Sequence, residues 1–136
     1  MKAEATLEIH VRYRDCDPLG HVNNAVYLTY FEMGRVEFWR AVMGARVDRA
    51  DDWPFILAEA TVTYRSPARF DERLRLAVAV GEIGGKSWTF AYRLTGSDGR
   101  EVATGRTVQV AYDYGAKKAI PLPDDVRRKL EGRPPA

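Results

Sequence analysis

The sequence is poor in several residue types, and each shortage limits what the protein can be. It has one cysteine, Cys16, among 136 residues, so no disulfide can form within the chain, and a reducing compartment is favoured. No apolar run approaches the roughly 20 residues that span a bilayer. Residues 1–10 include acidic side chains and lack the apolar centre of a signal peptide. We therefore expect a cytoplasmic protein that does not insert into a membrane.

An excess of charge of one sign is also absent. The 21 Lys and Arg residues nearly balance the 19 Asp and Glu residues, which leaves a formal net charge of +2. This balance argues against a basic surface that binds nucleic acid, although a local basic patch can still receive a phosphorylated ligand. Cysteine and histidine do not occur at metal-ligand spacing, so no metal centre is expected.

Apolar residues are plentiful, at 46% of the total, which fits a single domain over residues 1–136 with a thin core. In residues 6–14 apolar and polar positions alternate, which predicts a half-buried strand that ends at Pro18 and Gly20. The side chains expected to point inward are Leu7, Ile9, Val11 and Tyr13.

A long apolar helix is predicted next, over residues 24–43, with Asn23 or Asn24 as its N-cap and Gly44 at its C-terminal end. Its apolar residues occupy most of the circumference, so we expect burial on most sides. Gly34 falls on the core face, where it allows a sheet to approach closely.

The rest of the chain has the pattern of an antiparallel sheet. A polar loop leads to four predicted strands and a short final helix, with no strand–helix–strand repetition that would indicate a parallel sheet. We predict an α+β fold in which a curved antiparallel sheet of about five strands wraps around one long helix. The predicted loop covers residues 45–53, the strands 56–66, 73–83, 87–95 and 101–112, and the last helix about 124–131.

Two further expectations follow from this sheet. In its second strand, residues 56–66, alternation places one set of side chains on a common face. The free edge and open face of such a sheet favour pairing with a second copy of the chain. The side chains expected to share that face are Ile56, Ala58, Ala60, Val62 and Tyr64.

The segment from residue 15 to 24 joins the first strand to the helix and gathers the groups that can carry chemistry. It contains two carboxylates, Asp15 and Asp17, a histidine, His21, and the free N–H groups at the start of a helix. Hydrolysis of an acyl thioester needs a carboxylate that attacks or activates water, N–H donors for the oxyanion and a slot for the acyl chain. This segment therefore indicates a catalytic turn for thioester hydrolysis.

The two carboxylates have an alternative interpretation, in which each caps the turn or pairs with Arg12 or Arg14. Alternation along the strand does not decide which of the two aspartates is catalytic. Asp17 is the better placed for catalysis, because it lies beside Pro18, where the chain turns toward the helix.

This segment carries a family resemblance. The string Asp15-Cys16-Asp17-Pro18, followed by Gly20 and by Asn24 and Tyr27 at the head of an apolar helix, resembles the 4-hydroxybenzoyl-CoA thioesterase family of hotdog-fold enzymes. Residues 64–67 before Asp71-Glu72 resemble it too, and the likeness covers essentially the whole chain.

The resemblance implies an acyl-CoA thioesterase that works as a homodimer or homotetramer. Coenzyme A is then part of the substrate, and no separate cofactor is expected. Asp17 falls on the catalytic acid of the family, as nucleophile or general base. Asn24 falls on the residue whose backbone N–H polarises the thioester carbonyl.

Substrate contacts follow from the same hypothesis. The acyl chain would lie along the helix near Tyr27 and Phe31. The family places basic residues near the glycine turn before Lys86 against the phosphates of coenzyme A. This makes Lys86 a candidate phosphate contact, with Arg65 or Arg69 as further candidates.

His21 and the residues after it also resemble the plant acyl-carrier-protein thioesterases. In that family an aspartate, an asparagine and a histidine act at alternate positions, which here hold Asp17, Leu19 and His21. The asparagine is missing. His21 is a candidate base or water-orienting group, and a structural cap is the alternative.

Other side chains allow other interpretations. Cys16 near His21 suggests a thiol nucleophile, but adjacent carboxylates raise a thiol pKa, whereas a reactive thiol needs a lower one. Glu32 and Arg35 are interpreted as an ion pair on the helix, and a contact of Glu32 with a partner subunit's site is the alternative.

Two other functions remain open for the whole chain. One is a non-catalytic module that binds acyl-CoA or acyl-carrier protein. The other is a hotdog dehydratase, which requires an acid–base pair that only Asp17 and His21 offer.

Overall fold

One antiparallel sheet and one long helix make up most of the protein. The computed structural model describes residues 2–46 and 54–133, and none of the helices in these two ranges is long and apolar enough to cross a membrane. The elements are β1 (Glu4–His10), a 3-10 turn (Tyr13–Asp15), α1 (Val26–Met43), β2 (Phe55–Tyr64), β3 (Arg73–Ile83), β4 (Ser87–Thr95), β5 (Glu101–Asp113), β6 (Lys118–Ala119) and α2 (Asp124–Leu130).

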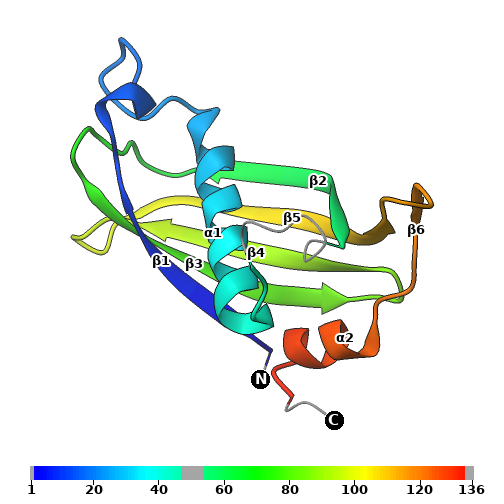
Figure 1. Ribbon diagram of the computed structural model, residues 1–136. Coiled ribbons are helices and arrows are strands. Elements are labelled where there is room, and N and C mark those ends of the chain that lie inside the picture. The colour runs from blue at the N-terminus through cyan, green and yellow to red at the C-terminus, as the bar shows by residue number, and fades with distance from the viewer. Residues whose placement is uncertain (1, 47–53, 134–136) are drawn as a thin grey trace.

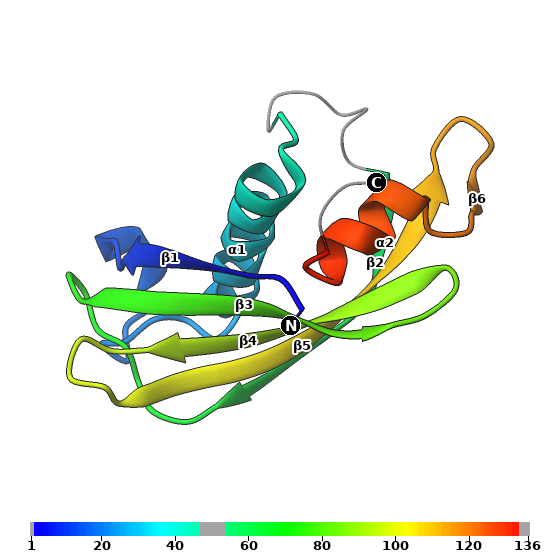
Figure 2. The ribbon, with the colours of Figure 1, turned by 90° about the horizontal axis from the view of Figure 1, so that it is seen from below.

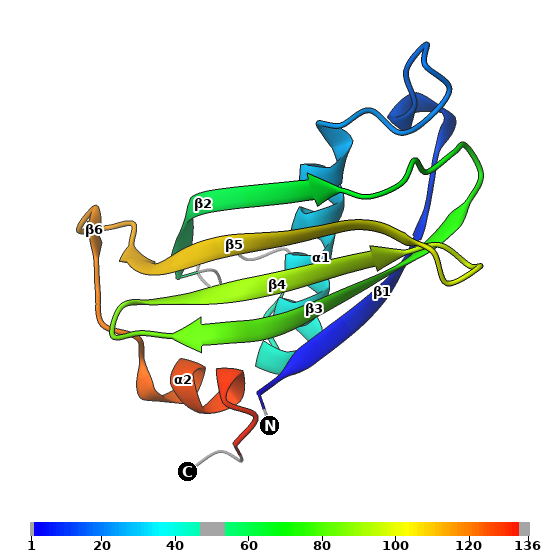
Figure 3. The same cartoon turned by 180° about the vertical axis from the view of Figure 1, so that it is seen from behind.

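The sheet has the strand order β1-β3-β4-β5-β2, and the short β6 pairs with the end of β5. All pairings are antiparallel. The helix α1 crosses one face of the sheet (Figure 1), and the view from behind shows the other face without a helix over it (Figure 3). Figure 2 shows the sheet curving beneath α1 and α2. The predicted α+β hotdog fold is confirmed, with β6 as an unpredicted addition.

The core lies between α1 and the inward faces of β3 and β4. Their alternating apolar side chains are buried as the pattern predicted, and each large one contributes about 1.5–3 kcal/mol of burial. The ring of Phe31 stacks on Tyr92 with centroids 4.3 Å apart. Buried side chains on the two strands are Leu74, Leu76, Val78, Val80, Trp88, Phe90, Tyr92 and Leu94.

Two glycines fix how α1 sits on this sheet. A Cβ at Gly34 would lie 2.6 Å from both Leu76 Cδ2 and Val78 Cγ2, so a side chain there would force Leu76 and Val78 or the helix to shift. Gly44 ends the helix in the left-handed conformation with φ of 68°. Both roles were predicted, and both are confirmed.

The junction between β1 and α1 differs from the prediction. The strand ends at His10, and Tyr13 begins a 3-10 turn, so strand alternation no longer applies to it. Tyr13 is 81% exposed, and its predicted inward position is wrong. The helix starts at Val26 with Ala25 as its N-cap, two residues later than predicted.

The face predicted for β2 is wrong at Ile56. A register shift between Leu57 and Glu59 places one extra residue in the strand, and side chains on either side of it change faces. Ile56 pairs with Val110 on the outer face, whereas Ala60 pairs with the buried Thr107 on the helix side.

The ion pair predicted between Glu32 and Arg35 does not form in the described part of the chain. Glu32 is exposed, and Arg35 is buried with its guanidinium donating to the Tyr92 hydroxyl at 3.1 Å. That hydroxyl is in turn 2.6 Å from the Thr107 hydroxyl. Arg35 points toward the sheet, so the spacing of three residues on the helix does not bring the two charges together. Most of the loop predicted at 45–53 lies outside the described residues.

Candidate active site

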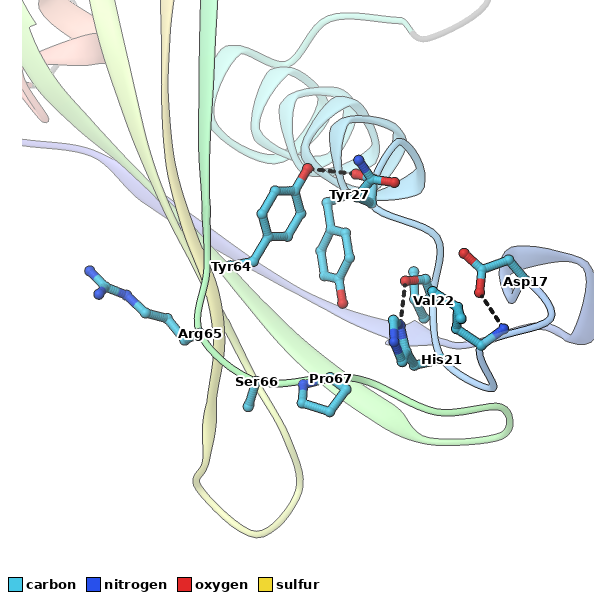
Figure 4. A pocket seen from close by; sticks show the side chains of 10 residues that line it. Asp17, His21, Val22, Tyr27, Tyr64, Arg65, Ser66 and Pro67 are labelled. Atoms are coloured by element: carbon cyan, nitrogen blue, oxygen red, sulfur yellow. Dashed lines mark hydrogen bonds between the residues drawn. The ribbon is translucent and has the colours of Figure 1, made fainter.

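A cavity of about 430 Å³ lies between the turn that follows β1, the start of α1 and the end of β2 (Figure 4). Five residues proposed from the sequence line it together, although they come from three separate segments. The lining residues are Asp17, Leu19, His21, Val22, Asn24, Tyr27, Tyr64, Arg65, Ser66 and Pro67.

The turn that carries Asp17 is closed by its own backbone. The Asp17 N–H donates to the His21 carbonyl at 3.2 Å, and the Gly20 N–H donates to the Asp17 carbonyl at 2.9 Å. Gly20 has φ of 86°, a conformation that glycine adopts without strain. The Val22 N–H then donates to the Ala68 carbonyl at 2.8 Å, which ties the turn to the loop after β2.

The carboxylate of Asp17 is held at both oxygens. Oδ1 accepts the backbone N–H of Leu19 at 2.9 Å, and Oδ2 accepts the side-chain Nδ2 of Asn23 at 3.0 Å. These two bonds fix the rotation of the carboxylate while the side chain still lines the cavity. An oriented carboxylate at a cavity wall suits either attack on a carbonyl or activation of a water molecule.

Asp15 has a different environment, and it does not line the cavity. It is 3% exposed and accepts hydrogen bonds from the Arg12 N–H at 2.9 Å, the Arg12 guanidinium at 3.0 Å and the Tyr30 hydroxyl at 2.9 Å. Burial alone would raise the pKa of Asp15, but these bonds and the Arg12 charge outweigh it and lower that pKa. The alternative interpretation, in which an aspartate of this turn pairs with Arg12, is therefore confirmed for Asp15.

The backbone N–H groups just before α1 differ in their hydrogen-bond partners. The Asn23 carbonyl accepts the Val26 N–H at 2.9 Å, and the Asn23 side chain accepts the Ala25 N–H at 2.9 Å. The Asn24 N–H has no acceptor within the described residues. In a trans peptide C=O and N–H point in opposite directions, so the Asn23 carbonyl, held by Val26, directs the Asn24 N–H away from the helix.

His21 and Cys16 are not linked to Asp17 by a side-chain hydrogen bond in the ranges described. The His21 Nδ1 lies 3.3 Å from the Val22 carbonyl oxygen, which is a long contact. The Cys16 thiol is weakly bonded to the Arg12 carbonyl, and burial followed by the charges of Asp15 and Asp17 raises its pKa. A raised pKa opposes the role of thiolate nucleophile.

The wall opposite the turn is built by the end of β2 and the loop after it. Arg100 donates from Nε to the Ser66 hydroxyl at 3.1 Å and from NH2 to the Pro67 carbonyl at 3.0 Å. The same guanidinium binds Glu72 at 2.9 Å. One arginine from the turn before β5 thus holds the segment that carries Ser66 and Pro67 in the cavity wall.

Three predicted substrate contacts lie apart from this cavity or at its edge. Phe31 is fully buried against Tyr92 and is not a lining residue. Lys86 lies in the turn between β3 and β4, at the end of the sheet opposite to the Asp17 turn (Figures 1 and 3). Arg65 lines the cavity edge, extends away from Asp17 in Figure 4, and has its Nε 3.5 Å from Glu101 Oε1.

Sequence reasoning missed two residues that the structure brings to the site. Asn23 was considered only as a helix cap, although its amide has both a donor for Asp17 and an acceptor for the Ala25 N–H. Tyr64 donates its hydroxyl to the Asn24 carbonyl at 2.8 Å across 40 residues of chain. The spacing of Asn23 from the acid turn is a usable local signal, whereas no local pattern predicts the Tyr64 contact.

The part of the chain that the structure describes contains no group of three or more His, Cys, Asp or Glu side chains placed to hold a metal ion. The site brings together an oriented carboxylate, the unbonded backbone N–H of Asn24 and an open cavity. Together with the curved sheet and its helix, these features define the class of hotdog-fold thioester hydrolases.

Comparison with known proteins agrees with that class. The thioesterase-like superfamily matches residues 11–130, and the chain belongs to this family. Similar proteins include the long-chain acyl-CoA thioesterase FadM of Escherichia coli, 29% identical over 91% of this chain and 95% of FadM. The acyl-CoA thioester hydrolase YbgC of Escherichia coli is 27% identical over 87% of this chain and 89% of YbgC.

Solved structures give the same result. A thioesterase from Thermus thermophilus, complexed with coenzyme A and zinc, superposes with a TM-score of 0.82 at 32% identity and covers 95% of each chain. A predicted thioesterase from Bacillus stearothermophilus superposes with a TM-score of 0.87 at 26% identity, covering 98% of this chain and all of that one.

Proposed function

We propose that this protein hydrolyses acyl-CoA thioesters, with Asp17 as nucleophile or general base and the Asn24 N–H as oxyanion donor. The observation that carries the proposal is the shared cavity, which the Asp17 carboxylate and Asn24 both line. Two of the similar proteins support acyl-CoA as the substrate class. FadM is named a long-chain acyl-CoA thioesterase, and the Thermus thermophilus thioesterase was solved with coenzyme A bound.

Two routes fit an oriented carboxylate. In the general-base route Asp17 takes a proton from water, the hydroxide oxygen bonds to the carbonyl carbon, and the carbonyl electrons move to its oxygen. Collapse of this oxyanion breaks the C–S bond and releases the coenzyme A thiolate, which is then protonated. In the nucleophilic route the Asp17 oxygen bonds to the carbon and displaces the thiolate, and water hydrolyses the resulting anhydride.

The Asn24 N–H acts in the same way in both routes. Negative charge develops on the thioester oxygen as the carbonyl carbon becomes tetrahedral. A preorganised N–H donor stabilises this charge without rearranging at the moment of reaction, and removing one such donor typically costs about 10²–10³ in kcat. The positive end of the α1 dipole adds to this effect.

The substrate-binding residues are part of the proposal. Tyr27 supplies the apolar wall for the acyl group, with Phe31 one helical turn deeper along α1. Arg65 at the cavity edge is available to a phosphate of coenzyme A. Lys86 is distant from the cavity of its own chain, so its phosphate contact would be made across the interface of a homodimer.

The test is thiol release from a panel of acyl-CoAs, from acetyl to palmitoyl with benzoyl and phenylacetyl, by wild type and Asp17→Asn. The variant keeps the size of the side chain and removes its charge, and we expect it to lose about 10²–10⁴ of the turnover. Equal rates for the two proteins would refute the mechanism. Binding by calorimetry with no release from any acyl-CoA would instead support the non-catalytic module.

A further inference from the structure

Tyr64 is the last residue of β2, and it makes a contact that the two hydrolytic routes do not by themselves require. Its hydroxyl donates to the Asn24 carbonyl at 2.8 Å. Its ring packs edge-to-face on Tyr27 with centroids 5.2 Å apart, which limits how the hydroxyl can move (Figure 4). The side chain is 50% exposed and lines the cavity.

The Asn24 carbonyl precedes α1, so it does not belong to the helical hydrogen-bond ladder. The peptide between Asn24 and Ala25 is held on one side by the Tyr64 hydroxyl and on the other by Asn23 Oδ1, which accepts the Ala25 N–H. The preceding peptide is held through the Asn23 carbonyl by Val26. Both planes around Asn24 are therefore fixed, and its own N–H is left unbonded within the described chain.

Tyr64 is itself well anchored. The N–H groups of the two residues after it, Arg65 and Ser66, both donate to the Val102 carbonyl, at 2.9 and 3.1 Å. Ser66 is held further by Arg100 Nε and donates its hydroxyl to the Glu101 carbonyl at 2.7 Å. The end of β2 thus provides a rigid base from which the hydroxyl reaches the start of α1.

We propose that Tyr64 is a positioning residue: it holds the peptide between Asn24 and Ala25, and thereby the backbone of Asn24, so that the N–H of Asn24 points at the oxyanion. This inference rests on the proposed thioesterase function and adds a residue to it. The contact adds a hydrogen bond at the start of α1 between two segments that the Val22–Ala68 bond also joins, the turn with its helix and the far wall of the cavity.

Removal of the hydroxyl should affect the chemical step more than substrate binding. Tyr64→Phe keeps the ring against Tyr27 but leaves the Asn24 carbonyl without its donor. Because small misplacement of a catalytic group can cost up to about 10² in rate, we expect kcat to fall about 10- to 100-fold. We expect KM to change by less than about threefold, since a backbone donor that acts mainly in the transition state contributes little to ground-state binding.

The chain offers a matched control at the other end of β2. The Tyr114 hydroxyl donates to the Phe55 carbonyl at 2.7 Å, and Tyr114 is 56% exposed. Tyr114→Phe therefore deletes the same kind of hydrogen bond on the same strand, away from the cavity. We expect its kcat and KM to equal those of wild type.

A second measurement separates this inference from the proposed function. In ¹⁵N-labelled protein, Tyr64→Phe should shift the amide resonances of Asn24 and Ala25 and speed the hydrogen exchange of the Ala25 amide, which donates to Asn23 Oδ1, while Tyr114→Phe should not. If wild type hydrolyses acyl-CoA and Tyr64→Phe matches Tyr114→Phe in kcat, the inference is wrong and the proposed function stands. A raised KM with unchanged kcat would also overturn it, by making Tyr64 a substrate contact.

A failure of the proposed function can also be told apart from a failure of this inference. If no acyl-CoA is hydrolysed but the Asn24 and Ala25 amides respond only to Tyr64→Phe, the proposed function fails and the structural part of the inference is upheld. If these amides do not respond to Tyr64→Phe, the hydroxyl does not hold the peptide and the inference fails whatever the activity.

Discussion

At the scale of single residues, the two aspartates of the turn differ through their partners. Asp15 is buried and binds Arg12 and Tyr30, whereas Asp17 binds the Leu19 N–H and the Asn23 amide at the cavity wall. The first arrangement uses the whole carboxylate for folding. The second fixes the carboxylate but leaves it beside the space where a substrate can bind.

The role of Asn23 can be tested through the pH dependence of turnover. Asn23→Asp keeps an acceptor for the Ala25 N–H but replaces the donor to Asp17 with a second carboxylate. Two adjacent carboxylates repel, so each binds a proton more readily than it would alone. We expect the acidic limb of the kcat/KM profile to move upward by about one pH unit or more. An unmoved limb in a folded variant would show that Asn23 does not orient the catalytic group.

Asp15 should matter for stability rather than for turnover. Its pKa is lower in the folded protein, so its stabilising effect is present above the ordinary carboxyl pKa, about 3.9, and is lost as pH falls through the folded value. Asp15→Asn should reduce the free energy of unfolding by about 2–4 kcal/mol at pH 7. Urea denaturation at pH 7 and at pH 3 checks this, since the difference from wild type should shrink at the lower pH.

At the scale of elements, the position of α1 on the sheet decides where the turn that carries Asp17 lies. The helix can approach β3 closely because Gly34 has no side chain in contact with Leu76 and Val78. The rings of Phe31 and Phe38 then pack on Tyr92 and Phe90. The packing of the middle of the helix therefore sets the position of its N-terminal end, which carries the free N–H of Asn24.

Gly34→Ala tests this close approach. Alanine favours a helix by about 1 kcal/mol over glycine, but the added methyl group would overlap two side chains of β3. We expect a net loss of about 1–3 kcal/mol in the free energy of unfolding, measured by chemical denaturation. Gly85→Ala is the control, because a Cβ at Gly85 meets nothing within 4 Å. A Gly34→Ala protein as stable as wild type would mean that the helix can move away at no cost.

At the scale of the whole molecule, β2 is an edge strand that a single chain leaves exposed. It is an edge strand of 10 residues, and most of its side chains are exposed, including Ile56 at 39% and Leu57 at 41%. A long edge with apolar side chains is an available pairing surface. We expect the predicted homodimer or homotetramer to form by pairing along β2.

Leu57→Lys tests this assembly. A lysine at this half-exposed position costs an isolated chain little, but at an interface it buries a charge without a partner. We expect wild type to elute as a dimer or tetramer in size exclusion with light scattering, and Leu57→Lys to shift toward the monomer. Thr6→Lys, on the opposite edge strand β1, should leave the mass unchanged. A monomeric wild type would exclude pairing along β2.

The order and type of nearly all elements follow from local patterns in the sequence. The period of two matches burial at alternate residues from Leu74 to Val80 in β3 and from Trp88 to Leu94 in β4, and Gly44 ends the helix where predicted, because these features depend on neighbours in the chain. The acid turn was also recognisable, since Asp17, Gly20 and Asn24 lie within ten residues. Local pattern could not decide the inward position of Tyr13, which depended on where the strand ended.

Which residues meet depends instead on how the helix and the sheet pack together. This packing separated Asp15 from Asp17 by burying one beside Tyr30, and it moved Arg35 away from Glu32 toward Tyr92. It brought Tyr64 to the start of α1 and left Lys86 at the other end of the sheet. These contacts join segments far apart in sequence, and their geometry follows from how the helix packs on the curved sheet, which no local pattern contains.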